Sequence, residues 1–353
     1  MYLHIICMVK KILITGGSGF IGSNLVNYFL KKKIYKVINV DKLNYSSTPD
    51  KFKKFTVNVD YKFIKADLSD KKNFYKILIK YKPEIIFNLA AETHVDRSID
   101  SPLNFIKNNI ISSLSLAETV KKFNLKNKLK NIKLIHISTD EVYGNVLGKP
   151  SDEKKAYEPN SPYAASKASV DHILRSYSET YGMPLIIVNC CNNYGPYQFP
   201  EKFIPTTIIN ILKKKSVPIY GSGKNVREWI HVYDYCSALE KIMKKGKIGH
   251  NYNVGTGHRI ANINLSKIVY FKMKKLFPNF KFNKKIFKKI ADRPGHDFRY
   301  AINSNKIRNK LNWKPKINFK DGIEDTINWY ISNIRWLKYC SKKYKGQRLG
   351  LND

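Results

Sequence analysis

The chain has 353 residues, 43% of them hydrophobic, and a formal net charge of +37. This length suits a dinucleotide-binding domain that carries a smaller second lobe. No apolar run approaches the roughly 18 residues that a membrane-spanning helix needs, so we expect no membrane partner. The lysines form short clusters between predicted elements, such as residues 31–33 and 213–215, instead of a stripe interleaved with aromatic residues. We therefore expect solvated lysine faces and no specific nucleic-acid partner.

Cysteine usage and the N-terminal residues indicate a reducing compartment. Five cysteines show no metal-ligand spacing, and their odd number argues against a disulfide framework, so we expect no metal site. The apolar residues 1–9 run directly into a predicted strand and do not have the pattern of a signal peptide. Met8 is the more natural beginning for such a strand, which would make residues 1–7 an extension. A cytoplasmic location is expected.

The first elements predict a nucleotide-binding turn. Residues 11–15 form a short apolar run, a glycine-rich turn follows, and a helical pattern continues to Leu30. Glycines at 16, 19 and 22 permit the tight turn, the approach of a pyrophosphate to the backbone and close packing of helix on strand. An ordinary strand–helix turn is the alternative, because a glycine triplet alone is weak evidence.

A second apolar run, residues 36–40, ends at Asp41, which lies 19 residues after Gly22. An acidic side chain at this spacing can hold the adenosine ribose hydroxyls, so the sequence favours NAD over NADP. Asp41 could instead cap the strand end, and the neighbouring Lys42 leaves room for a 2′-phosphate.

Two further strands are predicted at residues 62–66 and 84–89, and they end in Asp67-Leu68 and Ala90-Ala91. Small residues at the second of these ends let a flat cofactor pass close to the backbone. Strands that alternate with helices predict an α/β fold, a doubly wound parallel (Rossmann) sheet with a smaller mixed α/β substrate lobe.

The catalytic candidates come from two later segments. The strand predicted at residues 133–138 leads directly into Thr139, Asp140 and Glu141, which read alone would be a helix-capping turn. A helical pattern then places Tyr163 and Lys167, four residues apart, on one face. An ammonium beside a phenol, together with an oxidised nicotinamide, favours the phenolate and lowers the pKa of Tyr163, which could then act as a base.

With these features in this order, the chain resembles the extended short-chain dehydrogenase/reductase family, and within it the nucleotide-sugar 4,6-dehydratases, from about Lys10 to Trp329. The most discriminating block is STDEVYG at residues 138–144. Further matching blocks are AAETHVDRS at 90–98, NNYGPYQFPEK at 192–202 and DRPGHD at 292–297. The resemblance implies NAD as cofactor, a nucleoside-diphosphate glucose as substrate, and a homodimer built through helices packed between subunits.

The resemblance also implies catalytic roles. Tyr163, assisted by Lys167, would take the C4 hydroxyl proton during oxidation, and Thr139 would bind the C4 oxygen. Glu141 would then remove the acidified C5 hydrogen, and Asp140 would protonate the departing C6 hydroxyl. Asp140 must therefore hold a proton near neutral pH.

Binding residues follow from the same resemblance, and they fall into a cofactor set and a substrate set. The cofactor set is Gly16, Gly19, Phe20, Ile21, Gly22, Asp41, Lys42, Asp67, Leu68, Ala90, Ala91, Asn108, Tyr163, Lys167 and Asn193. For the substrate, the expected diphosphate ligands are Asn192, Lys202, Arg227 and Asn262, the nucleoside ligands are Pro218, Tyr220, Arg293 and His296, and the glucose ligands are Thr93 and Thr139.

We expect an NAD-binding domain over residues 8–190 that takes back part of 225–262, a mainly substrate-binding lobe over 191–330, and a C-terminal tail over 331–353. A nucleotide-sugar 4-epimerase would share the cofactor platform and the Tyr163/Lys167 pair but has no need of Asp140 and Glu141. A non-catalytic basic binding protein on the same fold would have no need of any of them. Thymidine is the expected nucleoside, with uridine as the alternative.

Overall fold

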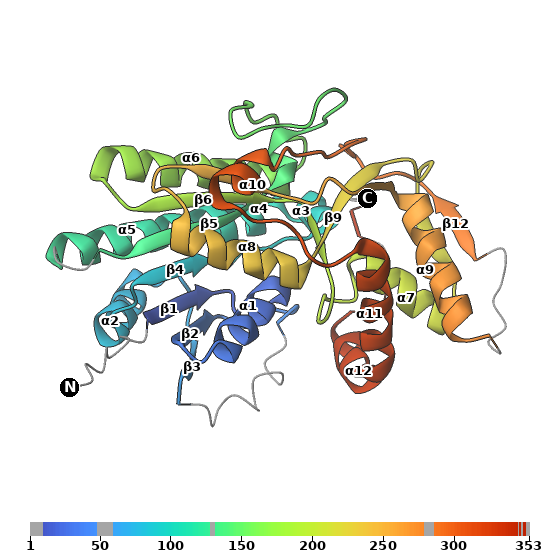
Figure 1. Cartoon of the computed structure of the whole chain (residues 1–353), viewed down its shortest axis with the longest axis horizontal. Coiled ribbons are helices and arrows are strands. Elements are labelled where there is room, and N and C mark those ends of the chain that lie inside the picture. Colours follow the sequence, from blue (N-terminus) through green and yellow to red (C-terminus); the bar gives the residue numbers. More distant parts are fainter. Residues whose placement is uncertain are drawn as a thin grey trace.

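The structure is a computed structural model, and it describes residues 10–47, 59–127, 131–278, 286–344, 346 and 349–350. Whether the chain starts at Met1 or Met8 concerns residues outside these ranges. Figure 1 shows a large lobe built on a central sheet, beside a smaller lobe in which α7, α9, α11 and α12 lie together.

The large lobe is built on a seven-stranded sheet with strand order β10-β6-β5-β4-β1-β2-β3. Every neighbouring pair is parallel. The strands are β1 (Lys10–Thr15), β2 (Tyr35–Asp41), β3 (Tyr61–Lys65), β4 (Ile85–Asn88), β5 (Lys133–Thr139), β6 (Leu185–Cys190) and β10 (Asn251–Val254). The predicted doubly wound parallel sheet is therefore confirmed, and the five predicted strands lie within a residue or two of the observed bounds.

Helices cover both faces of this sheet. On one face, α1 (Phe20–Lys31) and α8 (Val232–Lys245) contact each other and contribute to a core that includes Leu25, Phe29 and Leu239. On the other face, α2 (Lys71–Tyr81), α5 (Ser112–Lys126) and α6 (Pro162–Tyr181) pack in sequence over a core that includes Phe74 and Leu116. A sheet buried on both faces has apolar strands throughout, which explains the near-continuous hydrophobic runs in the sequence.

The smaller lobe has two short sheets and its own hydrophobic core. One sheet has the order β11-β9-β7 and the other pairs β12 with β8. The strands are β7 (Asn192–Tyr194), β8 (Val217–Tyr220), β9 (Val226–His231), β11 (Arg259–Ala261) and β12 (Phe287–Ile290). The helices α7 (Phe203–Leu212), α9 (Asn262–Leu276) and α11 (Phe319–Ser332) pack around them.

The described residues also include shorter helical segments. They are α3 (Val95–Asp100), α4 (Pro102–Phe105), a π-helix (Ile106–Ile111), a 3₁₀ turn (Asp140–Tyr143), α10 (Asn305–Leu311) and α12 (Ile334–Lys343). Among the described residues, no helix is both long and apolar enough to cross a membrane. Because β5 and β6 run in parallel beside β4 and β1, their carboxyl ends open at one edge of the sheet, where a ligand of this fold binds.

Candidate active site

Two of the glycines after β1 are required by the geometry of the turn. Gly16 has a φ of +66°, and a Cβ there would lie 2.8 Å from the backbone nitrogen of Ala90. A Cβ on Gly22 would lie 2.2 Å from the carbonyl oxygen of Gly16. The backbone nitrogen of Ser18 donates to Oδ2 of Asp41 at 2.9 Å, which joins this turn to the end of β2. The turn therefore has the close backbone approach that a pyrophosphate needs.

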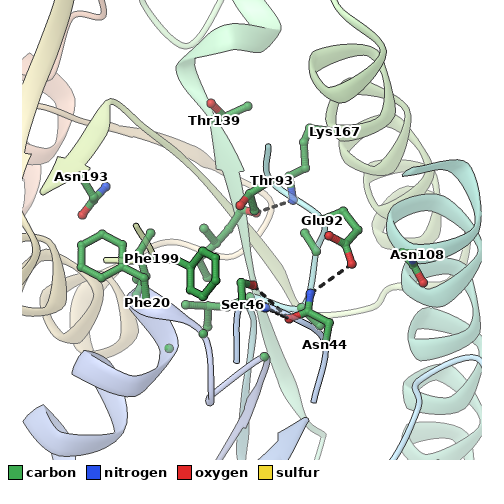
Figure 2. Close-up of a pocket in the computed structure, with 18 of the residues that line it drawn as sticks. Phe20, Asn44, Ser46, Glu92, Thr93, Asn108, Thr139, Lys167, Asn193 and Phe199 are labelled. Atoms are coloured by element: carbon green, nitrogen blue, oxygen red, sulfur yellow. Dashed lines mark hydrogen bonds between the residues drawn. The ribbon is translucent and has the colours of Figure 1, made fainter. Parts of the chain in front are cut away.

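A cavity opens above this turn along the carboxyl ends of the strands. All residues of the predicted cofactor set line it, and so do all of the predicted catalytic residues. Figure 2 shows Phe20 at the start of α1, Lys167 reaching in from α6, and Asn108, Thr139 and Asn193 on other sides of the same space. The structure thus brings together side chains that the sequence separates by more than 100 positions.

The end of β2 has an acidic and a basic side chain with different surroundings. The Asp41 carboxylate is buried and accepts a second backbone hydrogen bond, from the nitrogen of Leu43 to Oδ1, at 2.7 Å. Burial raises the pKa of Asp41, and these backbone donors oppose that rise. The Lys42 ammonium is hydrogen-bonded to Asn108 and lies 3.7 Å from Asp67. Because the Lys42 ammonium already has these partners, the Asp41 carboxylate determines the charge at this strand end. A carboxylate suits ribose hydroxyls better than a 2′-phosphate.

The end of β5 combines a helix cap with the predicted acid pair. The Thr139 hydroxyl accepts from the backbone nitrogen of Glu141 at 3.3 Å, so Thr139 caps the 3₁₀ turn. The same hydroxyl donates to Oδ1 of Asp140 at 3.3 Å. The capping interpretation of this segment is therefore correct as well, because the cap fixes both carboxyl groups at the cavity.

Burial controls the protonation of these two carboxyl groups. Burial first, and then the neighbouring carboxylates of Glu141 and Glu228, raise the pKa of Asp140 well above its ordinary value. Burial also raises the pKa of Glu141, but there the charges of Arg293 and Arg227 oppose the rise. Asp140 therefore holds its proton more tightly than a surface carboxyl does, which is the property that an acid catalyst needs.

Tyr163 and Lys167 lie on the buried face of α6, which begins with Ser161 as its N-cap. The Lys167 Nζ donates to the carbonyl oxygen of Ile137 at 2.7 Å. Burial lowers the pKa of Lys167 to about 8. Burial and then the carboxylate of Glu141 raise the pKa of Tyr163 well above its ordinary value, so the lowering predicted with an oxidised nicotinamide in place stays a prediction. A hydrogen bond with Thr139 opposes that rise.

The predicted substrate set is divided by the structure. Thr93, Thr139, Asn192 and Lys202 line the cavity, and the Lys202 Nζ donates to the carbonyl oxygen of Thr93 at 2.6 Å. The remaining members do not line this cavity, and they are Pro218, Tyr220, Arg227, Asn262, Arg293 and His296.

Two carboxylates and the backbone explain the positions of several of these residues. Asp96 accepts from the Tyr220 hydroxyl at 2.9 Å and from the Arg293 guanidinium at 3.0 Å. His296 lies 2.6 Å from Oδ1 of Asp292. Arg227 donates to the carbonyl oxygen of Asp297 at 2.9 Å. Several of their polar groups thus have partners within the protein, whereas Nε of Arg293 has no hydrogen-bond partner among the described residues. Their contacts with the substrate stay a prediction.

Arg227 and Arg293 nevertheless act on the site electrostatically. The charge of each lowers the pKa of Glu141, so both lie near the acid pair. Arg227 is buried, and the Arg293 side chain is 16% exposed. Arg227 also lies over the ring of Tyr300 at 4.1 Å, and the hydroxyl of Tyr300 is 3.4 Å from Oε2 of Glu141. Two arginines and the ring of Tyr300, all from the smaller lobe, therefore lie near Glu141.

Several lining residues were missed by the sequence analysis, namely Asn44, Ser46, Glu92, Phe199 and Glu201. The Asn44 side chain donates to Oε1 of Glu92 at 3.0 Å, as Figure 2 shows. Glu92, Phe199 and Glu201 fall within the matching blocks 90–98 and 192–202, which was an available signal. Asn44 and Ser46 lie in a loop whose sequence has no such signal.

Comparison with known proteins identifies close relatives over nearly the whole chain. A family model described as GDP-mannose 4,6 dehydratase matches residues 13–326. The dTDP-glucose 4,6-dehydratase of Salmonella typhimurium is 41% identical over 341 residues, which cover 93% of this chain and 94% of that protein. The dTDP-glucose 4,6-dehydratase 1 of Escherichia coli K12 is 42% identical with the same coverage.

A solved structure agrees with these relatives. The dTDP-glucose 4,6-dehydratase of Streptomyces venezuelae, solved with NAD bound, superposes with a TM-score of 0.86 at 35% identity, and the match covers 94% of this chain and 99% of that chain. The chain therefore belongs to the dTDP-glucose 4,6-dehydratase family, within the extended short-chain dehydrogenases/reductases.

Proposed function

We propose that this protein is a hydro-lyase that converts dTDP-glucose to dTDP-4-keto-6-deoxyglucose and water. The observation that carries the proposal is the pair at the end of β5, in which a buried Asp140 with a raised pKa lies beside Glu141. An epimerase needs no such acid and base. The names of the relatives support the same reaction and the same nucleotide.

NAD is the cofactor that the cavity fits. The glycine cradle at 16–22 suits a pyrophosphate, and the Asp41 carboxylate at the end of β2 suits a ribose. The related enzymes from Streptomyces venezuelae and Bacillus anthracis were solved with NAD. When bound, NAD takes the hydride from C4 and returns it to C6, so the reaction has no net redox change.

The residues of the chain perform the proton transfers. Tyr163 takes the C4 hydroxyl proton, with Lys167 beside it and Thr139 holding the oxygen. Burial and Glu141 favour the protonated phenol, so Tyr163 would act as a base once the charge of Lys167 is joined by that of an oxidised nicotinamide. Glu141 then removes the C5 hydrogen, which the 4-ketone has acidified, and later returns a proton to C5. Asp140 gives its proton to the C6 hydroxyl, which leaves as water.

Incubation of the purified protein with dTDP-glucose and UDP-glucose together tests this proposal. Mass analysis of the dTDP-sugar should show the loss of one water, whereas an epimerase product would keep the mass of its substrate. One methyl group distinguishes the two bases and is worth about 1–3 kcal/mol in an apolar pocket, so a preference of roughly 10- to 200-fold is expected. Faster formation of the uridine product would contradict the thymidine assignment but leave the dehydratase chemistry standing.

We further propose that the protein is a homodimer that uses the face of α4, the π-helix, α5 and α6. Large apolar side chains are exposed on these elements, at Leu103, Ile106, Ile111, Leu125 and Tyr181. These elements contact one another, and exposed apolar side chains on adjoining elements are typical of a subunit interface. Sedimentation of the Ile111→Asp variant beside the parent tests the proposal, because only the parent should sediment as a dimer.

Domain organisation and location are also proposals. Pairing of β10 with β6 supports the assignment of part of 225–262 to the NAD-binding domain of residues 8–190, with 191–330 as mainly the substrate lobe. Trp336 in the tail of 331–353 packs against Tyr197 and Trp329, so the first part of the tail belongs structurally to the smaller lobe. A cytoplasmic location is supported by the buried free thiols of Cys190, Cys191, Cys236 and Cys340.

A further inference from the structure

Beside Lys167 lies a buried polar cluster that the proposed mechanism does not use, and of its four members only Ser138 lines the cavity. It consists of Asn88 from β4, His136 and Ser138 from β5, and Asp171 from α6. The side chains of His136 and Asp171 are only 1% and 2% exposed. Buried polar groups of this kind are costly unless they are paired, so their arrangement calls for a physical reason.

The hydrogen bonds of the cluster determine which nitrogen of His136 carries the proton. The Thr15 hydroxyl donates to Oδ1 of Asn88 at 2.8 Å, which leaves the Asn88 amide nitrogen to face Nδ1 of His136 at 3.0 Å. With the amide in this orientation, Nδ1 is an acceptor, and the proton of a neutral imidazole is on Nε2. Burial and the charge of Lys167 lower the pKa of His136 to about 4, so the ring is neutral.

His136 stands between a cation and an anion. Its Nε2 lies 3.3 Å from the Lys167 Nζ and 3.4 Å from Oδ1 of Asp171. Since Nε2 already carries a proton, it cannot accept one from Lys167, whose hydrogen bond goes to the carbonyl oxygen of Ile137. The Ser138 hydroxyl holds the other carboxylate oxygen of Asp171 at 2.6 Å. Asp171 is therefore kept close to Lys167 without pulling its ammonium out of the cavity.

The other titratable groups around Lys167 and Asp171 do not supply a competing charge. Cys190 faces Lys167 from β6, but burial raises its pKa to about 12, so its thiol is neutral. Tyr143 and Tyr157 lie near Asp171, and burial raises the pKa of both phenols. The charge of Asp171 adds to this rise, for Tyr143 after that of Glu153. Among the described residues, Asp171 is thus the anion that stabilises the charge on Lys167, against the burial that opposes it.

We propose that Asp171 is the counter-ion that keeps Lys167 protonated at neutral pH, and that His136, held neutral in one tautomer by Asn88, fixes the separation between them. Both are positioning residues, because they act through Lys167 and do not line the cavity. Their consequence for C4 oxidation rests on the proposed function, whereas the charge state of Lys167 can be measured without any reaction.

Competitive acetylation tests the proposal directly. The purified protein is labelled with trace acetic anhydride over a series of pH values, and the Lys167 peptide is quantified by mass spectrometry, since only the neutral amine reacts. In the parent, the midpoint for Lys167 should lie near pH 8. In Asp171→Asn it should fall by about one pH unit or more, because an uncompensated buried ammonium loses its proton more readily. In Asp171→Glu, which restores the charge, it should stay closer to the parent.

Glu179→Gln is the matched control, because it removes the same charge from an exposed position on the same helix and should leave the midpoint unchanged. If Asp171→Asn does not fold, Asp171→Ser makes the same charge change with a smaller side chain and should move the midpoint in the same direction. An unchanged or higher midpoint in the folded Asp171 variant overturns the proposal.

A second readout links the counter-ion to chemistry. In a Glu141→Gln background, reduction of bound NAD by dTDP-glucose isolates C4 oxidation. When the pH is raised in steps, Asp171→Asn in this background should lose the reduction about one pH unit below the point at which the background enzyme loses it. If Lys167 titrates as expected but no NAD is reduced in any variant, the proposed function has failed and the counter-ion stands. If NAD is reduced with the same pH dependence with and without Asp171, the positioning role is wrong.

Discussion

The hydroxyl of Thr139 lies 3.3 Å from Oδ1 of Asp140, whereas Oδ2 of the same carboxyl is buried and has no hydrogen-bond partner among the described residues. A carboxyl group with one oxygen unpaired in a buried site is more stable with a proton than without one. This relationship makes Asp140 the acid of the pair and leaves Glu141, which faces the charges of Arg227 and Arg293, as the base.

Separate removal of the acid and the base should uncouple oxidation from water loss. Asp140→Asn and Glu141→Gln should each slow dehydration by about 10²- to 10⁴-fold, the usual contribution of a positioned acid or base. Reduction of bound NAD should persist in both, because C4 oxidation comes first. Tyr163→Phe should suppress both steps. Rapid-mixing absorbance of reduced nicotinamide and mass analysis of the sugar measure the two steps, and full-rate dehydration by Glu141→Gln would contradict the assignment of the C5 base.

The same substitution of Asp140 should stabilise the fold. A group whose pKa is raised in the folded state keeps its proton there after the unfolded chain has lost it. The free energy of unfolding therefore falls as pH rises above the ordinary carboxyl range, until the pH passes the folded pKa. Asp140→Asn removes this dependence, so its melting temperature should match the parent near pH 4 and exceed it by roughly 2–5 °C at pH 7.

Asp325→Asn is the control for this measurement, since Asp325 is exposed on α11. Equal melting temperatures of Asp140→Asn and the parent at both pH values would show that folding does not raise the pKa of the Asp140 carboxyl.

The glycine turn at residues 16–22 allows the NAD site to be tested by adding a single methyl group. Gly22→Ala should cost about 1–3 kcal/mol of stability and weaken NAD binding, because its Cβ would lie 2.2 Å from the Gly16 carbonyl oxygen and 2.7 Å from the Cα of Gly17. Gly148→Ala adds the same methyl group where nothing lies within 4 Å. Thermal melts with and without NAD compare the two variants, and equal stabilisation of both by NAD would place the pyrophosphate elsewhere.

NAD should remain bound through the cycle, because the hydride taken from C4 returns to C6 within one visit of the substrate. When the protein is removed by ultrafiltration during turnover, the amount of NADH in the filtrate should be a small fraction of the amount of keto-sugar formed. An equal yield of free NADH and keto-sugar would indicate an ordinary dehydrogenase instead.

The sequence alone determined those parts of the fold and site that depend on local patterns. The apolar runs predicted five parallel strands almost to the residue, because strands buried on both faces are continuously hydrophobic. The turn at 16–22 was also predictable, since only glycine fits the approach of Ala90 to Gly16. The four-residue spacing of Tyr163 and Lys167 placed both on one helix face.

Tertiary structure decided the properties that depend on long-range neighbours. Burial and then the carboxylates of Glu141 and Glu228 raise the pKa of Asp140, and Glu228 comes from β9. His136 of β5 lies 3.3 Å from the Nζ of Lys167, which comes from α6. The guanidinium of Arg227 donates to the carbonyl oxygen of Asp297, which lies 70 positions away in the chain. Local periodicity contains no information on such contacts, because burial and Coulomb interactions depend on distances that exist only once the two lobes have packed.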